Sequence, residues 1–240
     1  MKNSPKDLRI MFAGPSGTGK TTLANFVSSN IGTVDNPLKF ISGSVSDLLP
    51  DTASIPHKEM LARDSKVLFL EDFQILNLRQ KLFRKTIEES GNFVSDRSFL
   101  DSAAYFLYKQ ADKLPQCEVE HFLNMCLMCL TQTCSHLILV PFNMQMYKGW
   151  ITEDNGKRIT SRYFQMEISS IMSMILEIWG FRKRGKINAI GKGFFINRAY
   201  EYGVTYGDLI TPYGSTRVFI LNEVNLENRK ELLTYILNKR

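Results

Sequence analysis

Residues 14–21 constrain the fold of this chain more than any other stretch. They read Gly-Pro-Ser-Gly-Thr-Gly-Lys-Thr, follow the apolar run 8–13 and precede a helix-forming pattern. This is a complete G-x-x-x-x-G-K-T motif between a strand and a helix, the context of a phosphate-binding loop. Its glycines permit positive φ, so that successive backbone N–H groups can point inward at an anion. We therefore expect a strand–loop–helix unit that binds a nucleoside triphosphate.

Each position of this loop has an expected role. Lys20 is expected to reach the β- and γ-phosphates of ATP, and the Thr21 hydroxyl to ligate Mg²⁺. The following helix directs the positive end of its dipole at the same anion. The residues expected to bind the nucleotide are Gly14, Pro15, Ser16, Gly17, Thr18, Gly19, Lys20, Thr21 and Thr22.

Strand-like and helix-like segments alternate along the chain, which is typical of a parallel sheet with helices on both faces. We expect a single α/β domain over residues 1–240, a P-loop three-layer sandwich with a parallel sheet of five strands. The strands are expected near 8–13, 38–42, 92–95, 136–141 and 217–221. The helices are expected near 20–30, 58–90, 100–110, 119–133, 160–179 and 226–238, with Gly91 ending the longest.

The composition fits a protein that handles phosphates. The chain has 240 residues and a net charge of +6, which suits either a phosphorylated substrate or nucleic acid. No apolar stretch approaches the roughly 20 residues of a membrane span. The segment 1–5 leads directly into the first strand, so we expect no signal peptide. A cytoplasmic protein is expected, in the host cytoplasm if a phage encodes it.

Four cysteines lie close together, and Cys126 and Cys129 have the spacing of metal ligands, with His121 and His136 nearby. The surrounding segment 122–130 is almost unbroken in its apolar character, which favours thiols that pack as small hydrophobes. A second Cys-x-x-Cys pair is absent. Buried cysteines are therefore the favoured interpretation, and zinc binding is the alternative.

A second motif, Asp96-Arg97-Ser98, follows a short apolar strand. In an open α/β sheet, ligand chemistry occurs at the carboxyl ends of strands. Asp96 can hold Mg²⁺ or accept a proton from an attacking hydroxyl, and Arg97 can bind phosphate oxygens. The alternative is that Asp96 caps the next helix and that Arg97 is solvated.

A third motif lies in a predicted lid at about 147–163. A turn carries Lys157 and Arg158, and Arg162 follows four residues later at the start of a helix. If the helix extends that far, both guanidinium groups share one face. They could then close over the triphosphate and neutralise the charge that develops during phosphoryl transfer. The alternative is a surface loop with scattered charge.

The segment 181–216 does not fit a minimal nucleotide-kinase core. It begins with Phe-Arg-Lys-Arg-Gly-Lys and continues with glycines and with Tyr200, Tyr202, Tyr206 and Tyr213. Cations interleaved with aromatic residues suit contact with DNA through phosphates and stacked bases. The alternative is a hairpin or short helix whose aromatic residues pack on the main domain.

These motifs, in this order, resemble those of P-loop nucleoside and nucleotide kinases. In particular, the chain resembles the AAA_28 group (AAA domain, nicotinamide-riboside-kinase-like) found in phages, over residues 8–178 and 216–240. The resemblance implies the roles argued above for Lys20, Thr21, Asp96, Arg97, Arg158 and Arg162. Some phage enzymes similar to this group phosphorylate 5-hydroxymethyluracil within DNA. The chain departs from its relatives in the insertion 181–216 and in lacking an extended Walker B strand with paired carboxylates.

We therefore expect an ATP- and Mg²⁺-dependent kinase that acts on a hydroxyl of a nucleoside-type acceptor. The acceptor is either a free nucleoside or nucleotide, or a modified base in DNA. An NTP hydrolase that acts as a switch is the alternative, and a purely nucleic-acid-binding module is a weaker one. Candidate acceptor contacts are Ser42, Ser44, Ser46, Asp47, Glu71 and Asp72.

Overall fold

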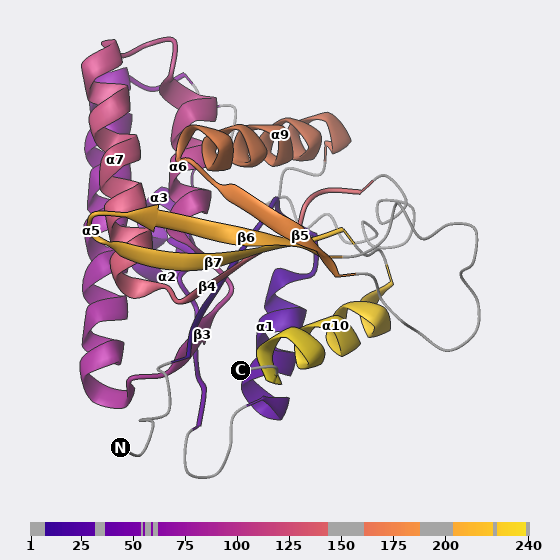
Figure 1. The fold of residues 1–240 in the computed structure, drawn as a ribbon. Coiled ribbons are helices and arrows are strands. Elements are labelled where there is room, and N and C mark those ends of the chain that lie inside the picture. The colour runs from indigo at the N-terminus through magenta and orange to yellow at the C-terminus, as the bar shows by residue number, and fades with distance from the viewer. Residues whose placement is uncertain are drawn as a thin grey trace.

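The computed structural model of this chain describes residues 8–31, 37–53, 55, 59, 62–143, 161–187, 204–222 and 225–238. Across these residues the chain forms a seven-stranded mixed sheet with helices on both faces (Figure 1). The strands are β1 Arg9–Ala13, β2 Lys39–Ile41, β3 Phe93–Ser95, β4 His136–Leu139, β5 Arg182–Ile187, β6 Val204–Thr211 and β7 Gly214–Leu221. The helices are α1 Lys20–Asn30, α2 Val45–Leu48, α3 Pro50–Ala53, α5 Ser65–Ser90, α6 Phe99–Gln110, α7 Gln116–Thr133, α9 Arg162–Ile178 and α10 Leu226–Asn238.

The sheet has the order β2-β3-β1-β4-β7-β6-β5. Neighbouring strands in the part β2-β3-β1-β4-β7 are parallel, which confirms the expected parallel part of the fold. The expected total of five strands is wrong for the described residues, because β6 and β5 extend the sheet by antiparallel pairing. We call these two strands the antiparallel extension. The basic residues at the start of this extension do not show the apolar pattern of a strand, so the sequence does not predict β5. The close pairing of β5 with β6 also requires a glycine in β6, which a sequence pattern does not reveal.

That glycine is Gly207, in the middle of β6. A Cβ on Gly207 would lie 2.2 Å from the carbonyl oxygen of Arg182 in β5 and 2.6 Å from the Phe181 ring. Real side chains do not approach backbone so closely, so any other residue here would push the two strands apart. The antiparallel extension therefore depends on a residue that usually weakens a strand.

Two helical layers cover the sheet (Figure 1). Helices α5, α6, α7 and α9 pack on one face, through residues such as Phe83, Phe106, Phe122, Ile168 and Met172. Helices α1 and α10 pack on the other, through residues such as Leu23, Val27, Leu232, Leu233 and Ile236. None of the helices that the structure describes is long and apolar enough to cross a membrane.

Local signals define the long helices around β3. Asp64 precedes α5 and accepts hydrogen bonds from the backbone N–H groups of Lys66 and Val67. Gly91 ends the same helix with a φ of 69°, which confirms the predicted stop. The chain then crosses β3 and enters α6 at Ser98. Helix α5 therefore ends just before β3, and α6 begins shortly after Asp96, which lies at the carboxyl end of this strand.

Candidate functional site

The loop 14–19 joins β1 to α1 at the carboxyl end of the parallel strands. Gly14, Gly17 and Gly19 have φ values of 149°, 78° and 85°, so the predicted positive φ is confirmed at all three positions. A Cβ on Gly14 would lie 2.3 Å from the carbonyl oxygen of Val140, just after β4. Both the backbone conformation and the neighbouring strand therefore require glycine at position 14.

Lys20 is the first residue of α1, and only 4% of its surface is exposed. Its Nζ donates hydrogen bonds to the carbonyl oxygens of Gly14 and Pro15, each over 2.6 Å. The ammonium group therefore lies against the loop itself. A cation withdrawn from water in this way is strongly stabilised by an anion, which is what a polyphosphate site requires.

Asp96 follows β3, the strand that pairs with β1 on one side. Thr21 Oγ1 donates a hydrogen bond to Asp96 Oδ2 over 2.7 Å, although the residues are 75 positions apart. Asp96 is buried, and its Oδ1 has no hydrogen-bond partner among the described residues. An unpartnered buried carboxylate oxygen is costly, and a divalent cation or a substrate hydroxyl would offset that cost. The structure thus brings together the two residues that the sequence assigned to Mg²⁺.

Ser98, rather than Asp96, caps α6. The Ser98 hydroxyl accepts from the backbone N–H of Asp101, and the Asp101 carboxylate accepts from the backbone N–H of Ser98 over 2.9 Å. This reciprocal arrangement is a capping box. The alternative interpretation of Asp96 as the helix cap is therefore wrong, and its carboxylate meets the loop instead.

Arg97 is half-buried, and among the described residues none forms a hydrogen bond or ion pair with its guanidinium. Its charge acts on the loop that follows β2. There, hydrogen bonds from Ser42 and Ser44 lower the pKa of Asp47, and the guanidinium of Arg97 lowers it further. Ser44 also hydrogen-bonds Ser46 over 2.7 Å. Among the predicted acceptor contacts, Asp47 therefore lies within electrostatic reach of Arg97, the residue next to Asp96.

The other predicted acceptor pair is engaged within the protein. Lys109 Nζ lies 2.5 Å from Asp72 Oδ1, and Gln110 Nε2 donates to Asp72 Oδ2 over 2.6 Å. Burial raises the pKa of Asp72. Glu71 forms an ion pair with Arg63 over 2.8 Å. The Asp72 contacts link α5 to α6, whereas the Glu71 ion pair joins α5 to the residues just before it. Both carboxylates are therefore occupied by partners from the chain itself.

Arg79 is a buried residue near the site that the sequence analysis missed. Its Nη2 donates to the carbonyl oxygen of Gly43 over 2.7 Å, and its Nη1 donates to that of Ser98 over 3.1 Å. Burial lowers the pKa of Arg79 to about 10. The available signal was its position between Leu76 and Phe83 on the apolar face of α5. Arg79 joins α5 to the loop after β2 and to the start of α6.

Tyr105 of α6 also approaches the phosphate-binding loop. Its hydroxyl lies 3.5 Å from Ser16 Oγ, and burial raises the pKa of Tyr105. Its ring lies 6.1 Å, centroid to centroid, from Phe164 of α9. On the same helix, Gln165 is buried and its Nε2 is 3.7 Å from the point where a Cβ of Gly17 would be. Helices α6 and α9 therefore both pack against the loop.

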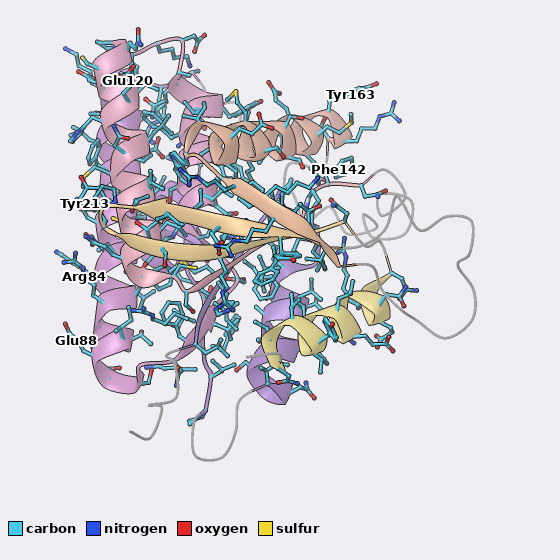
Figure 2. All side chains as sticks on the ribbon, in the orientation of Figure 1. Arg84, Glu88, Glu120, Phe142, Tyr163 and Tyr213 are labelled. Carbon is cyan, nitrogen blue, oxygen red and sulfur yellow. The ribbon has the colours of Figure 1, made fainter. Side chains whose placement is uncertain are left out.

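The predicted lid lies largely outside the described residues, including Lys157 and Arg158. Ser161 is the next described residue, and Arg162 is the first residue of α9. Arg162 is exposed, lies 4.9 Å from the ring centroid of Tyr163 and donates to the Tyr163 hydroxyl. Figure 2 shows Tyr163 at the free end of α9. The described contacts do not bring Arg162 to Lys20 or Asp96, and its catalytic role stays a prediction.

The described part of the insertion 181–216 contains exposed cations and a tyrosine that packs on the core. Arg182, Lys183 and Arg184 of β5 are exposed, and Arg184 forms an ion pair with Asp208 of β6. Tyr206 packs against the core on the α1 and α10 side. Tyr213 lies at the turn between β6 and β7 (Figure 2). Tyr200 and Tyr202 lie outside the described residues. The packing of Tyr206 fits the alternative, in which the aromatic residues pack on the main domain. The exposed cations fit the interpretation that this segment contacts DNA.

Three of the four cysteines are buried, as the favoured interpretation predicts. Cys126, Cys129 and Cys134 are buried, whereas Cys117 is exposed. Burial raises the pKa of Cys129 to about 11 and that of Cys134 to about 12, and it raises the pKa of Cys126 as well. No group of three or more potential metal ligands occurs among the described residues. Packing accounts for the three buried thiols.

Comparison with solved structures identifies the fold. A deoxyadenosine kinase from M. mycoides, with the products dCMP and dCDP bound, aligns with a TM-score of 0.58 and 12% identity. The alignment covers 97% of this chain and 100% of that one. The same enzyme with dATP bound gives a TM-score of 0.56, with 12% identity and the same coverage. At such low identity, these likenesses establish the shared fold alone.

Comparison of the sequence identifies the family. None of the curated proteins matches this sequence. The family model AAA_28, described as an AAA domain, matches residues 9–183, which is well over half of the chain. The match includes the phosphate-binding loop, Asp96 and Arg97, and it ends inside β5. This chain therefore belongs to the AAA_28 family of AAA domains.

Proposed function

We propose that this protein is a kinase that transfers the γ-phosphate of ATP to a hydroxyl of a nucleoside-type acceptor. The observation that carries the proposal is the 2.7 Å hydrogen bond from the loop residue Thr21 to the buried carboxylate of Asp96. Enzymes that transfer phosphoryl groups place a carboxylate beside the phosphate-binding loop, either to hold Mg²⁺ or to receive the acceptor's proton. The fold shared with a deoxyadenosine kinase supports the same reaction class.

The donor half of the reaction uses the loop. Its backbone N–H groups cradle the phosphates, and Lys20 exchanges its carbonyl partners for the β- and γ-phosphates. Thr21 and Asp96 are the residues that would hold Mg²⁺, which would neutralise phosphate charge. Arg97, Arg158 and Arg162 would stabilise the charge that develops on the transferred group.

In this proposal the acceptor binds next to Asp96. The acceptor oxygen forms a bond to the γ-phosphorus while the bond to the β–γ bridging oxygen breaks, and ADP leaves. The acceptor's proton passes to the unpartnered Oδ1 of Asp96 if this carboxylate acts as the base. Arg97, whose charge acts on both Asp47 and Tyr105, adds a cation next to Asp96, and these two residues add polar groups nearby in this proposal. This arrangement suits a polar nucleoside-type molecule.

Two acceptor classes remain to be separated by experiment. One is a free nucleoside or nucleotide, and the other is a modified base in DNA such as 5-hydroxymethyluracil. A net charge of +6 and the exposed cations of β5 support the DNA version. A base in DNA would have to leave the helix to reach a buried carboxylate.

The test follows the γ-phosphate. ATP labelled at this position is incubated with Mg²⁺, the protein and a panel of nucleosides, nucleotides, plain DNA and hydroxymethyluracil DNA. Transfer of label to a nucleoside or to DNA is expected and identifies the class. Release of inorganic phosphate under every condition would contradict the kinase proposal and favour an NTP hydrolase. The Lys20→Ala variant is the matched control for contaminating activity.

A further inference from the structure

Arg229 is a fully buried arginine in the first turn of α10, with only 1% of its surface exposed. Its Nη1 donates a hydrogen bond to the carbonyl oxygen of Thr18 over 3.0 Å. The two residues are 211 positions apart. The side chain of Asn225 accepts from the backbone N–H groups of Glu227 and Asn228 and so begins the helix. The last helix of the chain thus starts directly at the phosphate-binding loop.

The packing of α10 does not explain this arginine. The buried face of the helix consists of Leu232, Leu233, Ile236 and Leu237, packed against the sheet together with α1. Arg229 lies on the same face, because it is three and four residues before Leu232 and Leu233. An apolar residue would continue that face without the cost of withdrawing a guanidinium from water. The loop is one hydrogen-bonded partner of this guanidinium, and burying the charge there is consistent with a role in holding the loop.

The geometry of the loop explains why it needs such a partner. A loop that turns its N–H groups inward turns carbonyl groups outward, and each buried carbonyl requires a donor. The Pro15 carbonyl receives hydrogen bonds from Thr18 Oγ1 and from Lys20 Nζ. The Thr18 carbonyl receives one from Arg229. Lys20 is the donor that exchanges partners when phosphate binds, whereas Arg229 can keep its partner throughout.

We infer that Arg229 is a positioning residue for nucleotide binding. It holds the backbone of the loop in the phosphate-binding conformation through its hydrogen bond to the Thr18 carbonyl oxygen. The inference rests on the proposed function, because it assumes that the loop binds ATP. It adds a contributor that lies outside the family match at residues 9–183.

The experiment compares Arg229→Met, which removes the donor and the charge, with Leu233→Ala, which weakens the same helix without touching the loop. Arg229→Leu, which also removes the donor and the charge, provides the same comparison if the methionine variant does not fold. Titration calorimetry measures the Kd of ATP and of inorganic tripolyphosphate, and thermal unfolding measures stability. We expect the arginine variants to bind both ligands about tenfold more weakly, since a charge-assisted hydrogen bond is lost. We expect Leu233→Ala to lower Tm with ligand affinity unchanged.

The outcomes separate this inference from the proposed function. Wild-type affinity in a folded Arg229 variant would overturn the inference and leave the kinase proposal standing. An equal loss of affinity in Leu233→Ala would also overturn it, because helix stability would then explain the effect. Failure of the wild-type protein to bind ATP or tripolyphosphate would overturn the kinase proposal and the inference together.

Discussion

The parallel part of the sheet and the antiparallel extension carry their charged residues in different ways. In the parallel part, Lys20 at the start of α1 and Asp96 just after β3 are both buried. Lys20 donates to the loop, and Asp96 accepts from Thr21 of α1. In the antiparallel extension, Arg182 and Lys183 lie exposed along β5. The Arg184–Asp208 ion pair of the extension has an exposed arginine, whereas Lys20 and Asp96 are both buried next to the phosphate-binding loop. Burial of this kind is the better marker of a site that transforms a ligand.

The two regions also have one feature in common, which is a glycine that allows two backbone segments to come close together. A Cβ at Gly14 would meet the Val140 carbonyl oxygen at 2.3 Å, and one at Gly207 would meet the Arg182 carbonyl oxygen at 2.2 Å. The first contact shapes the phosphate-binding loop, and the second holds β5 on the sheet. The same chemical change should therefore have different consequences in the two regions.

The largest effect is expected at Lys20. Replacement with alanine removes the main counter-charge of the β- and γ-phosphates, so phosphoryl transfer should fall by about 1,000-fold. Single-turnover transfer from labelled ATP measures this loss, and circular dichroism checks that the variant is folded. Activity close to that of the wild type would contradict the assignment of the loop as the phosphate site.

The next largest effect is expected at Asp96. Asp96→Asn keeps an oxygen that can accept the hydrogen bond from the Thr21 hydroxyl, but it removes the negative charge. The transfer rate should therefore fall by about 100-fold. The dependence of the rate on Mg²⁺ concentration is measured alongside. A raised Mg²⁺ requirement would identify a metal ligand, whereas a lower rate at an unchanged Mg²⁺ requirement would identify a base. An unchanged rate would refute a catalytic role for Asp96.

The paired glycine variants test the comparison directly. Gly14→Ala should weaken ATP binding by about tenfold or more, because the loop backbone must move away from Val140. Gly207→Ala should lower the free energy of unfolding by about 1 to 3 kcal/mol through overpacking against β5, with ATP affinity nearly unchanged. Calorimetric titration and denaturant unfolding measure the two quantities. Equal loss of ATP affinity in both variants would show that the antiparallel extension also supports the loop.

The smallest effect on nucleotide binding is expected on the surface of β5. Replacing Arg182 and Lys183 with glutamine should change the Kd of ATP by less than about twofold, since exposed charges are screened by salt. The same variant reports on DNA binding. If both cations contact phosphates, the slope of log K against log salt should become shallower by about two. An unaltered slope would remove the main support for a DNA acceptor.

Much of the fold follows from local sequence signals. The apolar run before Gly14 predicts β1, and Gly91 predicts the end of α5, because each depends on neighbours within a few residues. The alternation of strands and helices predicts the parallel part of the sheet. The seven-stranded total could not be predicted in this way, because the basic residues of β5 resemble a surface loop until β6 pairs with them.

Some features of the candidate site also follow from local sequence, and others depend on the tertiary structure. The sequence by itself determined the phosphate-binding loop, because the positive φ of its glycines and the start of α1 are properties of a short continuous segment. It also placed Asp96 at the end of a strand. Only the tertiary structure decided that Thr21 donates to this carboxylate and that Arg79 and Arg229 are buried beside the site. The physical reason is that these contacts join segments far apart in the chain, and a buried polar group reveals its partner only when the chain is folded.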